Sequence, residues 1–406
     1  MSTSIEQGQA RIEWAVAHMP LLNRIRKDFL ADKPFAGKKI AMSIHLEAKT
    51  ACLAILLRDG GAEVAVTGSN PLSTQDIIAE ALAEYDGVSV HARHGVDEAE
   101  YTQHLRETIA FGPDMILDDG GDLLQILMDD PQDQVIGGCE ETTTGVARLR
   151  ILAREGRLPF PMFAVNDARL KFLFDNRYGT GQSTWDAILR STNLLIAGKD
   201  VVVVGYGWCG RGIALRAQGL GARVTVCDVD PVRALEARMD GFGVSTVADA
   251  LKTADFVITA TGCADAVSEE ALATAKDGVL LSNAGHFNVE VRPETLEKLS
   301  TSIREARPGI VEYTMPDGRR LYLMGEGRLV NLVLGDGHPV EIMDLSFAVQ
   351  ALTLRYLLEN SPLPAELLSV PAAIDDLVAR TKLETLGITI DRLTAKQRSY
   401  LGIHTE

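Results

Sequence analysis

The chain has 406 residues, of which 40 are lysine or arginine and 56 are aspartate or glutamate, giving a formal net charge of −16. Such an acidic chain disfavours a nucleic-acid surface and favours action on small molecules. No segment reaches the roughly 18 consecutive apolar residues of a membrane span, and the first residues are too polar for a signal peptide. We therefore expect a cytoplasmic protein that binds neither nucleic acid nor membrane, with a length that allows two domains.

The cysteines are scattered along the chain and show no spacing typical of a metal site. We expect reduced, mostly buried thiols and no bound metal. Cys209, which lies in a glycine-rich turn, is considered as a candidate reactive thiol. The other four are Cys52, Cys139, Cys227 and Cys263.

The first half of the chain alternates between strand and helix patterns. Residues 9–30 show helical apolar periodicity interrupted near Pro20, which predicts a pair of surface helices. The apolar runs that follow are separated by helices of about ten residues, which is typical of parallel βαβ units. The predicted strands are residues 38–44, 62–68, 88–92, 114–119 and 161–167. A first α/β domain is therefore expected.

Polar side chains follow these predicted strands, where open α/β sheets place their sites. Ser73, Asp76 and Asp122 are explained well enough as helix caps or turn residues. Carboxylates and a histidine that converge in one cleft provide the groups for proton transfer. The polar strand-end residues are His45, Glu47, Asn70, the run 73–76, Asp118, Asp119, Asp122, Glu140, Glu141, Thr142, Thr143, Thr144, Asn166 and Asp167.

The segment 171–185 joins this domain to the next. Lys171 and Asp175 stand four residues apart, so on a helix they would share a face. From the spacing alone, an ordinary surface ion pair is the simpler interpretation.

Residues 201–212 carry four valines followed by glycines at the spacing GxGxxG. Gly205 permits a tight turn, Gly207 lets a pyrophosphate approach the backbone, and Gly210 lets the helix pack on the sheet. The next strand ends at Asp228, roughly 20 residues past the glycines, where an acid contacts the adenosine ribose. This predicts a dinucleotide site and favours NAD over NADP, the alternative being a glycine-rich turn without a ligand.

The remaining chain completes two doubly wound, Rossmann-like α/β domains with parallel sheets and a short C-terminal helical tail. Further strands are predicted at 256–262 and 278–285, and a long apolar helix at 341–360 returns to the first domain. We predict a substrate-binding domain at residues 1–180 and 338–380, an NAD-binding domain at 181–337, and an amphipathic tail at 381–406 on a partner subunit.

The chain resembles the S-adenosylhomocysteine hydrolase family over nearly its whole length, in the shorter form found in archaea and some thermophilic bacteria. The matching blocks are HLEAKTA, STQD, DDGGDL, EETTTG, FDNRYG, GYGWCGRG, GHFNVE, EGRLVNL and GHP. The resemblance implies reversible hydrolysis of S-adenosyl-L-homocysteine to adenosine and L-homocysteine by a homotetramer. It also implies tightly bound NAD, with 3′-oxidation, elimination of homocysteine, addition of water and final reduction.

The resemblance also implies the roles of individual residues. Lys171 and Asp175 would handle the 3′-hydroxyl proton, Asp119 would take the 4′-proton, and Glu141 would hold ribose hydroxyls. His45 and His286 would manage the leaving sulfur and the attacking water. Asn331 would bind the carboxamide of NAD. Its other expected NAD contacts are Thr142, Thr143, Thr144, Asn176, Gly205, Gly207, Gly210 and Asp228, and the expected substrate contacts are Glu47, Lys49, Thr50 and His338.

Three departures from the family pattern bear on these expectations. The tail stops before the lysine and tyrosine that reach a neighbour's NAD in longer members, and Thr180 stands where a cysteine is common. Lys49 brings a cation to a place where many members hold an alkali ion beside the purine. Its ammonium and Glu47 would complement hypoxanthine, so S-inosyl-L-homocysteine is a rival substrate. The alternative is a simple pair between Lys49 and Glu47.

Two other classes of function are also considered. An ordinary NAD-dependent dehydrogenase would release NADH in proportion to substrate. An inactive regulatory relative would bind NAD and a partner protein, and the retained acids, bases and histidines argue against it.

Overall fold

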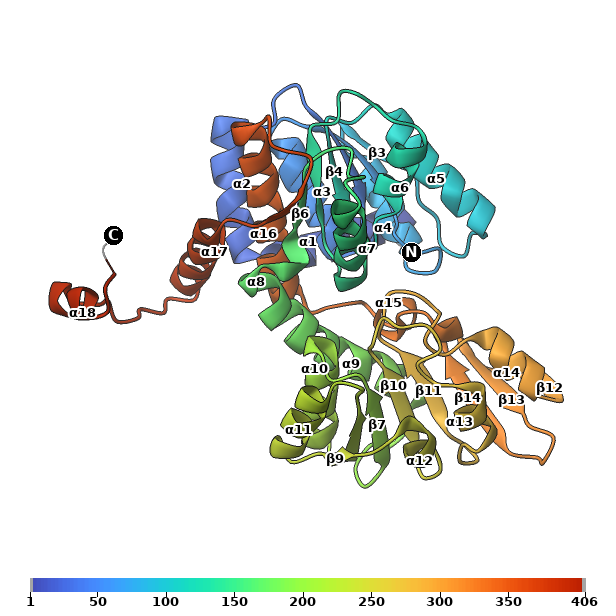
Figure 1. Ribbon diagram of the computed structural model, residues 1–406. Helices are drawn as coiled ribbons and strands as arrows, with labels where there is room; N and C mark the ends of the chain where they lie inside the picture. Colours follow the sequence, from blue (N-terminus) through green and yellow to red (C-terminus); the bar gives the residue numbers. More distant parts are fainter. Residues whose placement is uncertain (1–2, 404–406) are drawn as a thin grey trace.

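The computed structural model describes residues 3–403, which fold into two α/β units (Figure 1). The first unit is built on a seven-stranded sheet in the order β15-β6-β5-β4-β1-β2-β3, with every neighbouring pair parallel. Its strands are β1 (Lys39–Ser43), β2 (Glu63–Thr67), β3 (Val88–Val90), β4 (Met115–Asp118), β5 (Gly137–Glu140), β6 (Met162–Ala164) and β15 (Leu367–Ser369).

Helices cover both faces of the first sheet, because alternate side chains of each strand point to opposite sides. On β1, Ile40 and Met42 pack into one core and Ala41 into the other. The larger core is completed by α1 (Ser4–Ala17), α2 (Pro20–Asp32), α3 (Ala48–Asp59), α4 (Asp76–Ala83), α16 (Val340–Asn360) and α17 (Ala372–Thr385). The smaller core is completed by α5 (Glu98–Ala110), α6 (Asp122–Asp129) and α7 (Thr143–Arg154).

The second unit is built on an eight-stranded sheet in the order β12-β13-β14-β11-β10-β7-β8-β9. On β7, Val201 and Val203 enter one core while Val202 and Val204 enter the other, as expected of a strand buried on both faces. Its strands are β7 (Asp200–Val204), β8 (Arg223–Cys227), β9 (Gly243–Val244), β10 (Phe256–Thr259), β11 (Leu280–Asn283), β12 (Ser302–Arg307), β13 (Ile310–Thr314) and β14 (Arg320–Met324). Its helices are α9 (Thr180–Thr192), α10 (Trp208–Gly219), α11 (Pro231–Met239), α12 (Val247–Leu251), α13 (Glu269–Ala273), α14 (Pro293–Leu299) and α15 (Val330–Val333).

The doubly wound α/β architecture is thus confirmed in both units, with one addition to the second sheet. Strands β12, β13 and β14 form an antiparallel ribbon, and β14 joins the parallel strands by pairing with β11. This ribbon was not predicted. The side chains of the edge strand β12 are nearly all exposed, so it lacks the alternating apolar pattern that marks a strand.

A continuous helical segment connects the two units. After α8 (Arg169–Lys171), residues Phe172–Gly179 form a π-helix that runs directly into α9. The connection packs closely on α10, because a Cβ on Gly181 would lie 2.6 Å from the backbone of Gly212. Glycine at both positions therefore allows this helix to pack against α10.

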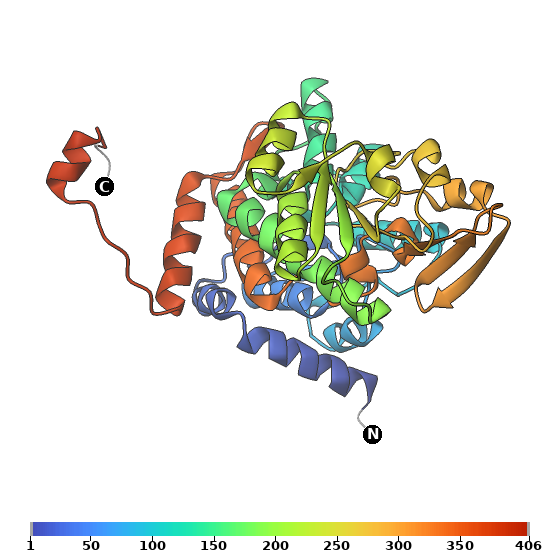
Figure 2. The same ribbon diagram turned by 90° about the horizontal axis from the view of Figure 1, so that it is seen from below.

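The C-terminal segment after α17 projects from the body of the protein (Figure 2). It ends with the short helix α18 (Ala395–Tyr400), and residues 404–406 of the predicted tail lie outside the described residues. Several apolar side chains of this segment are exposed, namely Leu386, Ile388, Ile390, Leu393, Tyr400, Leu401 and Ile403. Among the described helices, none is long and apolar enough to cross a membrane.

Candidate active site

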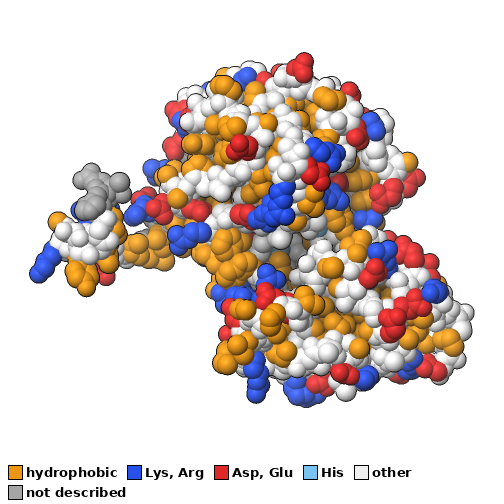
Figure 3. All heavy atoms as spheres, viewed as in Figure 1, with side chains coloured by type: hydrophobic (Ala, Val, Ile, Leu, Met, Phe, Trp, Pro, Cys, Tyr) orange, Lys and Arg blue, Asp and Glu red, His pale blue; other side chains and the backbone are white. Residues whose placement is uncertain are grey.

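A cavity of about 310 Å³ lies between the two units, with walls from both. In the space-filling view the two lobes meet at a waist (Figure 3). Most residues predicted for substrate and cofactor converge here, some from segments that follow strands of both sheets and others from the connecting helix, α15 and the segment just before α16. Those on the cavity wall are His45, Glu47, Thr50, Asp119, Glu141, Thr142, Thr143, Thr144, Lys171, Asp175, Asn176, Gly207, His286, Asn331 and His338.

One end of the cavity holds a buried charged cluster around Lys171. Its ammonium lies 3.2 Å from Asp175 Oδ1 and 3.6 Å from Glu141 Oε1, and it donates to Asn176 Oδ1 at 2.9 Å. The π-helix makes the last contact possible, because its i to i+5 repeat places residue 176 beside residue 171. Lys171 and Asp175 are only 4% and 3% exposed, so they are not the surface pair that their spacing alone favoured.

The charges in this cluster support one another. Burial alone would lower the pKa of Lys171, but Asp175 and Glu141 raise it above its ordinary value. Burial would raise the pKa of Asp175, yet Lys171 lowers it below its ordinary value. Burial raises the pKa of Glu141 to about 7, against the opposing effect of Lys171. The cluster therefore combines a fixed ammonium with a carboxyl group that exchanges its proton near neutral pH.

Helix α16 supports the same cluster from behind. Ser346 donates from Oγ to Asp175 Oδ2 at 2.7 Å, and Gln350 donates to Glu141 Oε2. Both residues are fully buried in a mainly apolar helix. They were not predicted as site residues, although two polar side chains four residues apart in such a helix are a usable signal.

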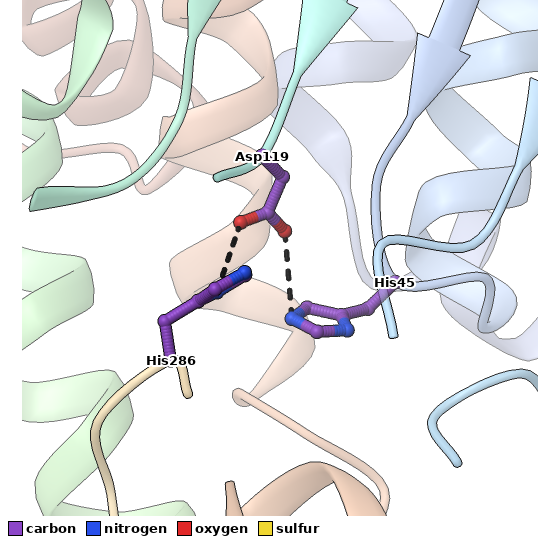
Figure 4. A group of neighbouring side chains, drawn as sticks. All are labelled: His45, Asp119 and His286. Carbon is purple, nitrogen blue, oxygen red and sulfur yellow. Dashed lines mark ion pairs between the residues drawn. The ribbon is translucent and has the colours of Figure 1, made fainter. Parts of the chain in front are cut away.

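The other end of the cavity holds Asp119 between two histidines (Figure 4). Asp119 Oδ2 lies 3.5 Å from His45 Nε2, and Asp119 Oδ1 lies 3.6 Å from His286 Nδ1. His45 follows β1 and Asp119 follows β4, both in the first unit, while His286 follows β11 in the second unit. This group is complete only where the two units meet.

The histidine group is only partly hydrogen-bonded, like the lysine cluster, in which Glu141 Oε1 has no hydrogen-bond partner among the described residues. Ser73 Oγ lies 2.7 Å from His45 Nδ1, and Ser69 donates to Asp119 Oδ2 at 3.1 Å. Among the described residues, Asp119 Oδ1 and His286 Nδ1 have no hydrogen-bond partner. Burial lowers the pKa of His45 to about 4 and also lowers that of His286, although Asp119 opposes both shifts. Both imidazoles are therefore neutral near pH 7, and each has a basic nitrogen to offer.

The same three side chains could also be arranged around a metal ion, since their ligand atoms lie within 4.8 Å of one another. The cysteine spacing led us to expect no metal, and that expectation stays a prediction. Proton transfer by the two imidazoles and the carboxylate needs no ion.

Glu47 and Lys49 form a buried pair at a third part of the cavity. Lys49 Nζ lies 2.6 Å from Glu47 Oε2 and donates to the backbone carbonyl of Asp336 at 2.7 Å. Glu47 also caps α3 by accepting from the amides of Lys49 and Thr50. Glu47 and Thr50 face the cavity, whereas Lys49 lies behind Glu47 and is not part of the wall.

The glycine loop of the second unit is shaped for a dinucleotide. Gly205 has φ +97°, and a Cβ there would lie 2.8 Å from Ala260 O, while a Cβ on Gly210 would overlap Gly205 O at 1.8 Å. At Gly207 the nearest described atom to such a Cβ is Arg233 Nη1 at 4.0 Å, so this backbone is open to a ligand. Gly207 precedes α10, whose first amides can hold a phosphate.

Two polar groups would complete a dinucleotide site. Asp228 accepts from the amides of Tyr206 at 2.6 Å and Asp230 at 2.9 Å, which fixes its carboxylate beside the loop. Asn331 donates to Ser183 Oγ at 3.0 Å, but its own Oδ1 is buried without a partner among the described residues. An unpaired amide oxygen of this kind suits a carboxamide donor, so the residues present fit NAD.

Several predicted residues therefore lie near the cavity without forming its wall, namely Lys49, Gly205, Gly210 and Asp228. Others on the wall were not assigned to the site in advance, among them Trp208, Cys209, Arg233, Leu332, Met343 and Phe347. Apolar wall residues give no sequence signal, because they look like ordinary core positions.

Two parts of the chain match one family. Residues 2–135 match the description "S-adenosyl-L-homocysteine hydrolase", and residues 176–337 match "S-adenosyl-L-homocysteine hydrolase, NAD binding domain". The chain belongs to this family. It is 55% identical to the adenosylhomocysteinase of Thermotoga maritima over 399 residues, which cover 97% of this chain and 98% of the relative.

Other family members carry two different names at nearly the same identity. The adenosylhomocysteinase of Thermococcus kodakarensis is 53% identical, with 97% of this chain and 94% of the relative covered. The S-inosyl-L-homocysteine hydrolase of Methanothermobacter thermautotrophicus is 54% identical, with 97% of this chain and 95% of the relative covered. Overall identity to the family therefore does not separate the two purines.

Proposed function

We propose that this protein catalyses the reversible, NAD-dependent hydrolysis of S-adenosyl-L-homocysteine to adenosine and L-homocysteine. The observation that carries the proposal is one cavity with the Lys171 cluster at one end and Asp119 between two histidines at the other. Oxidation at one ribose carbon and elimination at the neighbouring carbons each require acidic and basic side chains that can move a proton. The two groups in this cavity supply such side chains for both steps.

The lysine cluster would act at the 3′-position of the ribose. When bound, NAD would accept a hydride from the 3′-carbon and later return it. Lys171 and Asp175 would hold and move the proton of the 3′-hydroxyl group, with the Lys171 ammonium stabilising negative charge on that oxygen. Glu141, whose pKa is about 7, would accept a hydrogen bond from a ribose hydroxyl.

The histidine group would act at the 4′- and 5′-positions. A thioether leaves poorly until a carbanion can form beside it, and the 3′-ketone acidifies the 4′-proton for removal by Asp119. His45 and His286, both neutral at physiological pH, would assist the departing sulfur and the attacking water. Thr142, Thr143, Thr144 and Asn176 would contact the cofactor together with Asn331 and the glycine loop.

We also propose how the chain is divided and assembled. Residues 1–180 and 338–380 would bind substrate, residues 181–337 would bind NAD, and the tail 381–406 would lie on a neighbour in a homotetramer. The exposed apolar side chains of the projecting tail support this placement. Five free cysteines, including exposed Cys263, support a reducing, cytoplasmic location.

S-inosyl-L-homocysteine is the alternative substrate within the same chemistry. Lys49 carries a cation to the backbone of Asp336, just before the GHP motif, where an alkali ion would otherwise be expected. Because Lys49 lies behind Glu47, it would influence the purine mainly by fixing the position and charge of the Glu47 carboxylate. The local pair between Lys49 and Glu47 is the competing interpretation, and their 2.6 Å contact is compatible with both.

Thiol release from the two substrates, offered separately at equal concentration, tests the proposal. Preference for the adenosine compound supports the main assignment, and preference for the inosine compound makes Glu47 and Lys49 the specificity pair. Reduced cofactor formed in proportion to substrate, without thiol, identifies a dehydrogenase. Thiol from neither substrate contradicts the proposal and favours an inactive regulatory relative.

A matched pair of lysine variants addresses the purine preference directly. Lys49→Met should change the ratio of turnover on the two substrates if this lysine reads the purine edge. Lys38→Met removes a half-buried lysine paired with Asp114 at 3.1 Å, away from the cavity, and serves as the control. An unchanged ratio in Lys49→Met assigns Lys49 to a local ion pair.

A further inference from the structure

Arg148, on α7 of the first unit, lies against a loop of the second unit. Its guanidinium carbon is 4.5 Å from the centre of the Phe287 ring, in a cation–π arrangement. The same guanidinium donates to the backbone carbonyl of Gly120 at 2.7 Å and lies 3.3 Å from Asp122 Oδ1. Arg148 therefore joins the turn that follows β4 to the loop that follows β11.

The two ends of this link enclose His286. The rings of His286 and Phe287 pack edge to face with their centres 4.6 Å apart. On its other side, His286 rests directly on Gly120, where a Cβ would lie 2.5 Å from Nε2. His286 is thus held between Phe287 and Gly120, and both of these are contacted by Arg148.

We propose that Arg148 is a positioning residue that latches residues 285–289 of the second unit onto residues 119–122 of the first and so sets His286 against Asp119. The inference rests on the proposed function, because it concerns the step in which His286 takes part. Arg148 does not line the cavity, so its effect must pass through Phe287 and Gly120.

Arginine suits this task better than lysine. A planar guanidinium can lie over an aromatic ring and still direct its N–H groups sideways to a carbonyl and a carboxylate. Asp122 is itself fixed, because it accepts from Tyr101 Oη at 2.9 Å. The side chain of Arg148 is 48% exposed, so solvent weakens its ion pair, and the ring and carbonyl contacts matter more.

Arg150 offers a matched control on the same helix. Its side chain is 47% exposed, and it pairs with Asp167 rather than with the second unit. Arg148→Ala and Arg150→Ala therefore remove the same group, from the same helix and at the same exposure. Arg148→Lys keeps a cation over Phe287 and should restore part of any lost function.

Amide hydrogen exchange in the holoenzyme measures the latch without relying on activity. In Arg148→Ala we expect exchange at residues 285–289 to rise about tenfold, as expected for loss of a charged hydrogen bond and a cation–π contact. In Arg150→Ala the exchange of this loop should stay unchanged. Equal exchange in the two variants would overturn the proposal, as would faster exchange spread over the whole first unit.

Steady-state kinetics with S-adenosyl-L-homocysteine give the second measurement. Homocysteine release by Arg148→Ala should fall about tenfold while the fraction of reduced cofactor rises, because 3′-oxidation depends on the Lys171 cluster, which Arg148 does not contact. A fall in release without reduced cofactor would indicate a merely structural role and overturn the latch. If the wild type releases no homocysteine, the proposed function fails and the exchange comparison alone decides the latch.

Discussion

The two ends of the cavity are built in different ways. The lysine cluster is made entirely by the first unit and the connecting helix, and it is held by Ser346, Gln350 and Asn176. The histidine group takes one of its three members, His286, from the second unit. The lysine cluster therefore needs no residue of the second unit, whereas the histidine group forms only when His286 of the second unit lies against Asp119 of the first.

Removing the ammonium group of Lys171 from the lysine cluster should have the largest effect on activity. Lys171→Met leaves two acidic groups without their ammonium, and we expect homocysteine release to fall by about a thousandfold or more. NAD binding, measured by titration of the purified protein, should fall less than turnover, because the glycine loop lies in the second unit and only the proposed contact of Asn176 depends on Lys171. A Lys171→Met enzyme within tenfold of wild type would show that this cluster does not carry the oxidation step.

Displacing His286 from Gly120 should impair the step that depends on the histidine group while leaving the lysine cluster intact. Gly120→Ala adds a Cβ that would lie 2.5 Å from His286 Nε2 at a residue with φ +109°. We expect homocysteine release to fall by about tenfold to a hundredfold with reduced cofactor accumulating, because a misplaced group costs catalysis at its own step. Gly156→Ala, at φ +65° with open space around it, is the control for backbone strain alone. Similar losses in both variants would assign the effect to strain.

Removing a single hydrogen bond to the lysine cluster should have a smaller effect on activity. Ser346→Ala removes the 2.7 Å hydrogen bond to Asp175 Oδ2 from a fully buried site. We expect kcat to fall by about threefold to tenfold. The free energy of unfolding, measured with urea, should fall by about 1–3 kcal/mol. An unchanged kcat with the full loss of stability would make Ser346 a structural support only.

The pH dependence of stability should carry opposite signs at the two ends. His45 has a pKa of about 4 when folded and a higher one when unfolded, so its contribution to stability is present above the unfolded value, near 6.5, and is lost as pH falls toward 4. Glu141 has a folded pKa of about 7, so its contribution is present below the unfolded value, near 4.5, and is lost as pH rises toward 7.

Denaturant unfolding over this pH range tests both signs. His45→Asn should flatten the loss of stability on acidification, and Glu141→Gln should flatten the loss on raising the pH. Parallel curves for wild type and Glu141→Gln would mean that the Glu141 carboxyl group titrates normally in the folded protein.

Much of the fold could be predicted because its signals are local. The four valines of β7 fill cores on both faces of the second sheet, and Gly205 and Gly210 after them occupy positions that exclude a side chain. The antiparallel ribbon could not be predicted in the same way, because β12 is stabilised by pairing with β13 while its side chains stay in solvent.

The site was predictable by motif but not in its arrangement. Spacing could not reveal that Lys171 is buried, since the same pattern serves for a surface pair. The contact between Lys171 and Asn176 needs a π-helix, which no simple periodicity announces. Arg148 reads as one more charged residue on a helix surface, because Phe287, the ring it contacts, lies 139 positions later in the chain.

The backbone passes between the two units at the π-helix and again just before α16, and His338 ties these two crossings together. Its Nδ1 lies 3.1 Å from Asp175 Oδ1, and its Nε2 lies 3.2 Å from Thr180 Oγ1. A rotation of the two units about these crossings would leave the lysine cluster in place and would carry His286, which belongs to the second unit, away from Asp119. We expect such a rotation to open the cavity at the histidine group, so homocysteine would leave on that side.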